Sequence, residues 1–185
     1  MKLKKFKFKT VNSTNELAIK IIKNSKCKSG IIIAEKQKKG KGQHGKKWIS
    51  YKGNLFVSIF FTVDKINIPL KKMTKINCLL IKKLLSFYYK GKVTVKEPND
   101  LLVNKKKISG ILQEILTHSN QTFIIIGIGI NLIKSPYIRN YPTTNILDLT
   151  NIKIDKNNVI LRLKKIYEEF ILKFLKFNVI NLDKI

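Results

Sequence analysis

The chain opens with lysine and phenylalanine in alternation over residues 5–9, a pattern that predicts a half-buried strand. Ser13, followed three residues later by Glu16, fits the capping box that begins many helices. Apolar residues then recur at helical spacing to about Ser25, which predicts a helix. A short apolar run at 31–34 predicts a buried strand.

The next apolar run, residues 54–61, predicts a strand with both faces mostly covered. Asn67 and Pro69 suit the start of a second helix, and Gly91 suits its end. The apolar stripe predicted for this helix is Met73, Ile76, Leu80, Leu84 and Phe87.

Four strands are expected after that helix, over residues 93–96, 100–103, 108–116 and 122–132. A basic hairpin at 104–107 and a turn at 117–120 connect them, so together they predict an antiparallel meander.

Residues 136–149 are rich in loop formers, and a last helix follows, for which Asn157 or Asn158 is the expected cap. Its inward-facing residues are predicted to be Ile160, Leu163, Tyr167, Phe170, Ile171 and Phe174. We see no internal repeat and no linker, so 185 residues predict one domain, 1–185.

Composition places limits on the class of protein. No apolar run approaches the ~20 residues that span a bilayer, and the start lacks the apolar block of a secretory signal. We therefore expect a soluble cytoplasmic protein. Cys27 and Cys78 lie far apart without a CxxC or Cys/His cluster, which predicts two free thiols and no structural zinc.

The formal net charge of +27 is extreme and is typical of proteins that bind nucleic acids or anionic membranes. However, only Arg139 and Arg162 among the 38 basic residues are arginines, and the lysines are spread along the whole chain. A dedicated nucleic-acid surface would use more arginine for bidentate contacts. A genome-wide nucleotide preference and a basic nucleic-acid-binding module both stay open at this point.

The first candidate for chemistry is the turn Lys96-Glu97-Pro98-Asn99-Asp100, which lies between two predicted strands. Pro98 cannot donate to a sheet ladder, so the segment is expected to be a fixed turn or strand end. An ammonium held there can stabilise charge that develops on a phosphate or carboxylate. The alternative is a solvated lysine beside an ordinary turn.

The second candidate is the segment 35–48, where Gly40, Gly42 and Gly45 alternate with cations before Trp48, the only tryptophan. Backbone N–H groups and ammoniums in such a loop can surround a phosphate. The segment is neither a P-loop nor a Rossmann fingerprint, because GxxxxGK[ST] is absent and its GxGxxG letters open no predicted helix. A flexible surface loop is the alternative.

Taken together, four stretches resemble the catalytic domain of biotin–protein ligases. The matching stretches are Ser13-Thr14-Asn15; Gln37 with the run from Gly40 to Trp48; Lys96-Glu97-Pro98-Asn99-Asp100 continuing to Ser109-Gly110-Ile111-Leu112; and Gly127-Ile128-Gly129-Ile130-Asn131. In the family these elements occur in the same order, and they cover nearly the whole chain.

The resemblance implies an α+β fold, in which a mixed, largely antiparallel sheet is flanked by helices as in class II aminoacyl-tRNA synthetases. It implies a ligase that uses ATP and magnesium to convert biotin into biotinyl-5′-AMP. The ligase then transfers biotin to a lysine of a biotin carboxyl carrier protein or domain of acetyl-CoA carboxylase. The glycines of the 122–132 strand, which suit close backbone approach, can let a flat ring lie on the sheet.

The resemblance also implies roles for individual residues. Lys96 and Gln43 are the expected catalytic residues, and Asp100 is the candidate magnesium ligand. The expected biotin-binding residues are Ser13, Thr14, Asn15, Gln37, Gly40, Lys41, Gly42, Lys96 and Gly110. The expected nucleotide-binding residues are Gln43, Trp48, Asn99 and Asn131.

Three departures from the family pattern bear on function. Glu97 stands where tryptophan is usual, so it is expected to pair with Lys96, to contact magnesium or to weaken the site. Lys41 and Gln43 stand where arginine is common, and Gln43 removes a cation that would help to retain the adenylate, so leakage of the adenylate is an expectation. A lipoate or octanoyl ligase of related fold, and a degenerate ligase without turnover, stay open.

The ends of the sequence raise further expectations. The family's N-terminal DNA-binding module and C-terminal β-barrel are both expected to be missing, so no specific DNA binding is expected. A monomer or weak homodimer is the expected state.

Overall fold

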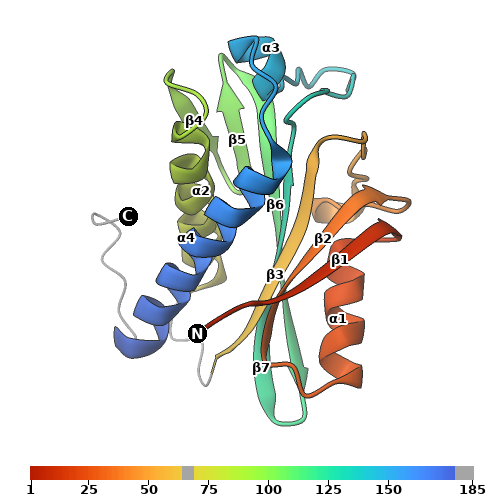
Figure 1. The fold of residues 1–185 in the computed structure, drawn as a ribbon, viewed down its shortest axis with the longest axis vertical. Coiled ribbons are helices and arrows are strands. Elements are labelled where there is room, and N and C mark those ends of the chain that lie inside the picture. Colours follow the sequence, from red (N-terminus) through yellow and green to blue (C-terminus); the bar gives the residue numbers. More distant parts are fainter. Residues whose placement is uncertain (64–68, 178–185) are drawn as a thin grey trace.

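A computed structural model of the chain describes residues 1–63 and 69–177, and its central feature is a seven-stranded sheet with the order β1-β2-β3-β7-β6-β5-β4 (Figure 1). The strands are β1 (Lys4–Val11), β2 (Ser29–Gln37), β3 (Leu55–Val63), β4 (Val93–Lys96), β5 (Asp100–Val103), β6 (Lys106–His118) and β7 (Gln121–Ile130). The helices are α1 (Thr14–Asn24), α2 (Leu70–Ser86), α3 (Ile146–Thr150) and α4 (Lys156–Phe177), with a short 3₁₀ turn, η1, at Gln43–Gly45.

The sheet is mixed because β1 pairs with β2 in parallel, whereas every other neighbouring pair is antiparallel. The predicted meander from β4 to β7 is confirmed. Its two hairpin turns, at Asn104–Lys105 and Ser119–Asn120, place both central residues at positive φ, the conformation that matches the twist of paired strands. The predicted α+β fold is therefore confirmed.

Helices cover both faces of the sheet. In Figure 1, α2 and α4 lie on one side and α1 on the other. The larger core lies beneath α2 and α4, and a smaller one, which includes Ala18, Ile32 and Phe60, lies beneath α1. β3 faces both cores and is buried along almost its whole length, which confirms the prediction of a strand covered on both faces.

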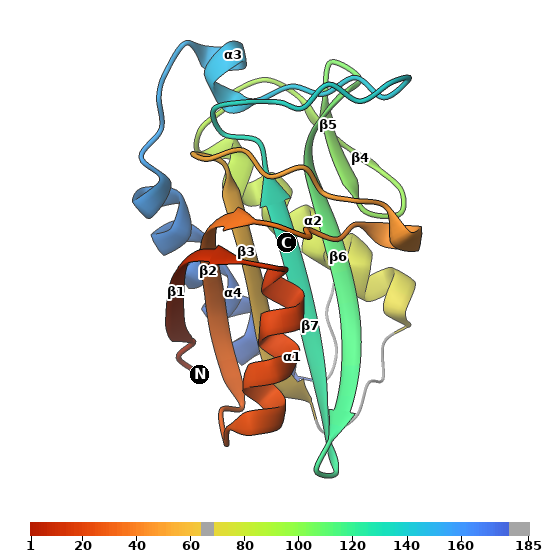
Figure 2. The same cartoon turned by 90° about the vertical axis from the view of Figure 1, so that its right-hand side faces the viewer.

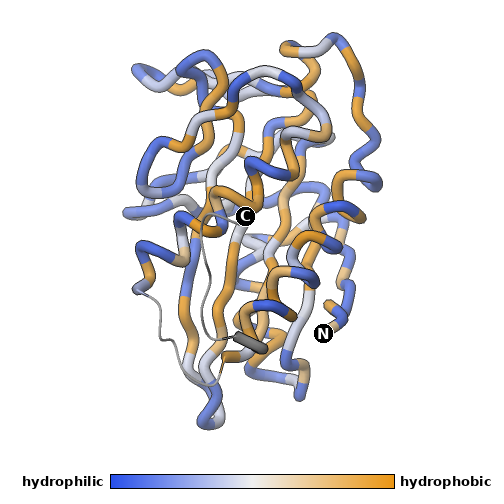
Figure 3. The backbone as a smooth tube through the Cα atoms, turned by 90° about the vertical axis from the view of Figure 1, so that its left-hand side faces the viewer, coloured by the Kyte–Doolittle hydropathy of each residue, from blue (hydrophilic) through white to orange (hydrophobic). Residues whose placement is uncertain are grey.

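The helices alternate between apolar and polar residues, as the colours along the tube show in Figure 3. All six residues predicted to face inward on α4 are buried. Tyr167, the largest fully buried side chain, donates a hydrogen bond to Asn77 Oδ1 of α2 at 3.0 Å, and Asn77 Nδ2 donates to Gln113 Oε1 of β6. This chain of polar contacts joins both helices to the sheet within the core.

The predicted end of α2 is wrong. The helix ends at Ser86 rather than near Gly91, because the N–H groups of Phe87, Tyr88 and Tyr89 fold back onto the carbonyls of its last turn. Phe87 lies outside the apolar stripe and is 48% exposed, with the Arg162 guanidinium 4.6 Å from its ring centre.

Other predicted boundaries also need correction. Pro69 is the N-cap of α2 rather than a first-turn residue, and Asn67 lies outside the described residues. Asp155, not Asn157 or Asn158, provides the side chain that accepts a hydrogen bond from the first turn of α4. β1 is an edge strand and more exposed than predicted, because it pairs on one side only.

Among the helices of the described part of the chain, none is both long enough and apolar enough to cross a bilayer.

We predict that Tyr167→Phe lowers the free energy of unfolding by about 1–3 kcal/mol, because Asn77 Oδ1 would lose its donor inside the core. Urea denaturation followed by circular dichroism measures this change. Tyr137→Phe is the matched control, since Tyr137 is 89% exposed. Equal stability of the two variants would contradict the assigned role of the hydroxyl.

Candidate functional site

A cavity of about 870 Å³ lies on the α1 side of the sheet, where the loops of several elements converge. This volume falls within the ~300–1,000 Å³ range of small-molecule sites. Figure 2 shows the segment between β2 and β3 crossing over β7 and β6. The cavity contains every residue predicted for the site except Gly40: Ser13, Thr14, Asn15, Gln37, Lys41, Gly42, Gln43, Trp48, Lys96, Asn99, Asp100, Gly110 and Asn131.

Gly40 lies behind this wall. Its carbonyl accepts a hydrogen bond from the Trp48 N–H, and a Cβ built on it would lie 2.6 Å from the Trp48 carbonyl oxygen. Lys41 and Lys47 form an antiparallel bridge beyond it. Gly40 therefore closes the loop at its base.

The floor of the cavity is a pair of glycines that face each other across strands. Gly110 of β6 and Gly129 of β7 are direct partners in the register. A Cβ on Gly129 would lie 2.3 Å from Trp48 Cζ2, and a Cβ on Gly110 would lie 2.8 Å from Trp48 Cζ3. The predicted flat ring on the sheet is thus present, and it is the indole of Trp48.

One end of the cavity is formed by the start of α1. Gln37 Oε1 accepts hydrogen bonds from the Thr14 N–H at 2.8 Å and from Thr14 Oγ1 at 3.1 Å. The predicted capping box is wrong, because Ser13 makes no side-chain cap bond and Glu16 pairs with Lys41 at 2.8 Å instead. Hydroxyl and amide groups remain at this end for a polar ligand.

Asn15 is held by the protein on all sides. Its Nδ2 donates to Glu114 Oε2 and to the Leu112 carbonyl, and its Oδ1 accepts from the Ser58 hydroxyl. Its side chain lies against the bare backbone of Gly127. Asn15 therefore fastens α1 to the sheet, and its contact with a ligand stays a prediction.

Lys96 sits at the opposite end, at the close of β4. Its ammonium lies 4.3 Å from the ring centre of Tyr141, and the Tyr141 hydroxyl donates to Asp100 Oδ2 at 2.7 Å. Lys107 lies 2.8 Å from Asp100 Oδ1 and faces the rings of Trp48 and Tyr141. Burial, followed by the bond to Asp100, raises the pKa of Tyr141, so its hydroxyl stays a donor.

The turn between β4 and β5 is fixed, as predicted. Asn99 Nδ2 donates to the Ile111 carbonyl at 2.7 Å, and the Ile111 N–H donates to the Asn99 carbonyl. Glu97 forms no ion pair with Lys96 and lies 3.7 Å from Lys71, with both side chains well exposed. Of the three expectations for Glu97, pairing with Lys96 is therefore wrong.

Asn131 is buried in the cavity wall. Its Nδ2 donates to the Thr144 carbonyl at 3.1 Å. Its Oδ1 has no hydrogen-bond partner within the described part of the chain. A buried acceptor without a donor is costly, and a ligand amino group can satisfy it.

The donor set does not fit a metal held by the protein. Residues 1–63 and 69–177 contain no group of three or more His, Cys, Asp or Glu side chains arranged around one point. Asp100, the predicted ligand, is already engaged by Lys107 and Tyr141. A magnesium ion would need most of its ligands from water and nucleotide phosphates.

The sequence pattern of the Biotin/lipoate A/B protein ligase family matches residues 7–131 of the chain. The chain belongs to this family.

The bifunctional ligase/repressor BirA of Bacillus subtilis is one relative of this biotin/lipoate ligase family member, 28% identical over 170 residues. The alignment covers 86% of the chain and 51% of that relative. BirA of Escherichia coli is 33% identical over 125 residues, which are 66% of the chain and 38% of that protein. The chain thus spans about half the length or less of these curated relatives.

A solved structure of biotin protein ligase from Aquifex aeolicus in complex with biotin and ATP superposes with a TM-score of 0.77 at 26% identity. It covers 94% of this family member and 72% of the Aquifex chain. The fold is therefore shared over almost the whole of the present chain.

Sequence reasoning missed two site residues of this biotin/lipoate ligase family member. Lys107 was interpreted only as part of a basic hairpin, and Tyr141 as part of a loop. Their roles arise from contacts with Trp48, Asp100 and Lys96 across different elements. The one available signal was the position of Lys107, which directly precedes the predicted strand 108–116 that carries Gly110.

We predict that Gly129→Ala displaces the Trp48 indole, because the new methyl group would overlap the ring. Trp48 is the only tryptophan, so the emission maximum of intrinsic fluorescence should shift to longer wavelength. Gly42→Ala is the control, since its Cβ would meet the Lys46 carbonyl oxygen at 3.3 Å but no atom of the indole. An unchanged spectrum of Gly129→Ala would contradict the packing of the ring on this floor.

Proposed function

We propose that the chain is an ATP-dependent biotin–protein ligase, with residues 1–185 acting as one catalytic domain. The observation that carries the proposal is one cavity with three kinds of groups. Neutral polar groups lie at the α1 end, the Lys96 ammonium lies at the β4 end, and an unpaired acceptor lies on Asn131. These groups suit a ureido ring, a carboxylate beside a phosphate, and an adenine amino group.

Lys96 has the central part in the proposed mechanism. Its ammonium would contact both the biotin carboxylate and the α-phosphate of ATP. This contact aligns the two anions and offsets the charge that builds up as the carboxylate oxygen attacks phosphorus. Pyrophosphate leaves, and biotinyl-5′-AMP remains in the cavity. The cation–π contact with Tyr141 holds the ammonium at this end before substrates bind.

The second half-reaction transfers biotin to a protein. A lysine amine of a biotin carboxyl carrier protein or domain attacks the acyl carbon, and AMP leaves. Trp48, packed on the glycine floor, and loop residues between Gly42 and Lys47 line the cavity, which supports their role in keeping water from the mixed anhydride. The cytoplasm, where ATP is available, is the proposed compartment.

Biotin is favoured over lipoate by the polar end of the cavity. Ser13, Thr14 and Gln37 present hydroxyl and amide groups there. A site built to hydrogen-bond a polar ring rejects an apolar one of similar size, because its own polar groups would lose their partners. The dithiolane ring of lipoate cannot provide these partners.

Magnesium, when bound with ATP, would supply positive charge that neutralises the phosphates. The predicted ligand, Asp100, lines the cavity but is already engaged by Lys107 and Tyr141, so the reaction does not depend on an ion held by protein side chains. The protein's own contribution to charge stabilisation rests on Lys96 and Lys107.

We predict that biotin and MgATP together raise the melting temperature far more than either alone. A ligand at 100 times its Kd stabilises by about 2.7 kcal/mol, which corresponds to roughly 5–10 °C for a chain of this size. Differential scanning fluorimetry measures the shift. Lipoate with MgATP is the control, and an equal shift with lipoate would indicate a lipoate ligase instead of a biotin ligase.

We predict that Lys96→Ala lowers the rate of biotin-dependent pyrophosphate release by about 10²–10³-fold, because the developing charge loses its stabilising group. Lys92→Ala is the matched control, since Lys92 is an exposed lysine just before β4 that does not line the cavity. Both variants should keep the wild-type circular dichroism spectrum. Undiminished pyrophosphate release by Lys96→Ala would remove Lys96 from its assigned role.

A further inference from the structure

The proposed reaction places a reactive acyl group in a cavity with a wall rich in lysine. Lys41, Lys46, Lys47, Lys96 and Lys107 all line it. Only the neutral amine of lysine is a nucleophile, and an ordinary lysine with a pKa of about 10.4 is neutral in about one molecule per thousand near pH 7.4. Any neighbouring group that stabilises the protonated ammonium lowers this neutral fraction further.

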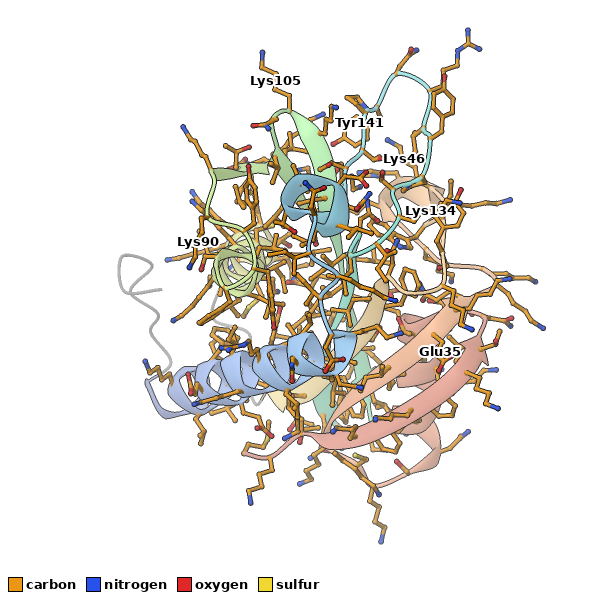
Figure 4. All side chains as sticks on the ribbon, turned by 45° about the horizontal axis from the view of Figure 1, so that its top comes forward. Glu35, Lys46, Lys90, Lys105, Lys134 and Tyr141 are labelled. Atoms are coloured by element: carbon orange, nitrogen blue, oxygen red, sulfur yellow. The ribbon has the colours of Figure 1, made fainter. Side chains whose placement is uncertain are left out.

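Three of the five ammoniums have an electrostatic partner. Lys41 lies 2.8 Å from Glu16, Lys107 lies 2.8 Å from Asp100, and Lys96 faces the Tyr141 ring. By contrast, no carboxylate of residues 1–63 and 69–177 lies within 4.0 Å of the Lys46 or Lys47 ammonium. Figure 4 shows Lys46 in the same part of the molecule as Tyr141.

Glu16 makes no capping bond in its own helix. It lies in the first turn of α1, where a capping bond is absent, and its carboxylate reaches across to the loop. The pair is formed between partly exposed side chains. The 2.8 Å distance between the two charged groups is much shorter than the ~8 Å screening length at physiological salt. Their attraction therefore persists at that salt concentration.

We propose that Glu16 shields Lys41 from acylation by the enzyme's own biotinyl-5′-AMP, and that self-modification falls instead on Lys46 and Lys47. The inference rests on the proposed function. Glu16 acts through Lys41 and takes no part in adenylate formation. At position 41, the loop thereby keeps a cation next to the activated intermediate without offering a nucleophile there.

The side reaction that Glu16 suppresses is an aminolysis. The neutral Nζ of a lysine attacks the acyl carbon of biotinyl-5′-AMP, and a C–N amide bond forms. The bond from the acyl carbon to the phosphate oxygen breaks, and AMP leaves with the electron pair. The amine loses one proton to water. An ammonium cannot begin this step because its electron pair is bound to the proton.

The charges around Lys41 support the assignment. The hydrogen bond to Glu16 raises the pKa of Lys41, and attraction by Glu16 and Glu114 adds to it, although partial burial opposes the shift. The returning arm of the loop, with Lys46 and Lys47, pairs with the backbone beside Lys41, within a chain of net charge +27. Without Glu16, Lys41 would lose the partner that most favours its protonated form.

The first test measures lysine reactivity without relying on the enzyme's activity. The full chain is treated with the N-hydroxysuccinimide ester of acetic acid across pH 7–10, and acetylation of each lysine is followed by peptide mass spectrometry. Glu16→Gln should increase the rate at Lys41 about tenfold for each unit by which its pKa falls. This gain should shrink as the pH rises toward the pKa of Lys41, because the neutral fraction then grows in both proteins.

Two controls separate charge from packing. Glu35→Gln removes one exposed carboxylate from β2, in a different part of the molecule from Lys46 and Tyr141 (Figure 4). It should leave the Lys41 profile unchanged. Glu16→Asp keeps the charge and should keep most of the protection. An identical Lys41 profile in Glu16→Gln and wild type would overturn the proposal.

The second test follows self-biotinylation with biotin and MgATP in the absence of a carrier protein, normalised to the AMP formed. Wild type should carry biotin on Lys46 and Lys47, whereas Glu16→Gln should also carry it on Lys41. If Lys41 stays unmodified in Glu16→Gln while AMP forms, the proposal is wrong. If wild type forms no adenylate, the proposed function fails, and the acetylation profiles still decide whether Glu16 shields Lys41.

Discussion

The site depends on a place in the sheet where two strands carry no side chains. Gly110 and Gly129 face each other across β6 and β7, and the Trp48 indole occupies the space that two Cβ atoms would fill. A third glycine, Gly127, gives the same room to Asn15. The first contact fixes the loop after β2, and the second fixes the start of α1. The loop after β2 and the start of α1, which form two walls of the cavity, are therefore positioned by glycines on the adjacent strands β6 and β7.

Lysine ammoniums lie around this floor in positions fixed by their neighbours. Lys107 lies over Trp48 and is paired with Asp100, and Asp100 also accepts the Tyr141 hydroxyl bond. Lys96 lies against the other side of this group, facing the Tyr141 ring. An anion that enters the cavity thus meets the ammoniums of Lys96 and Lys107, whose positions are fixed before it arrives. Preorganisation of this kind is what makes electrostatic stabilisation effective in a site closed to water.

The wider surface has a different character. Lys90 and Lys105 project outward in Figure 4, and the excess of lysine is spread over many elements. Carboxylates or aromatic rings accompany three of the cavity lysines. Outside the cavity, some lysines, such as Lys134 and Lys164, also have such partners. Net charge alone therefore says little about function here, and the local partners of each lysine say more.

Local patterns in the sequence predicted most of the fold. The meander, the covered strand β3 and the apolar stripe of α4 follow from periodicity, which is a property of neighbouring residues. The errors at Phe87, Ser13 and Asp155 lie at helix ends, where backbone capping and long-range partners decide the boundary. The glycines on β7 indicated a flat ring, but only the tertiary structure shows that the ring is Trp48. Tyr141 could not be predicted, because it acts through contacts with β4 and β5.

A crystal structure of the chain grown with biotin and ATP tests the central claim most directly. The account predicts biotinyl-5′-AMP in the cavity beside the Trp48 indole that covers the Gly110–Gly129 floor, with the Lys96 ammonium at hydrogen-bond distance, about 3 Å, from a phosphate oxygen. Electron density for the ligand outside this cavity, or a Lys96 ammonium that makes no contact with the ligand, would contradict it.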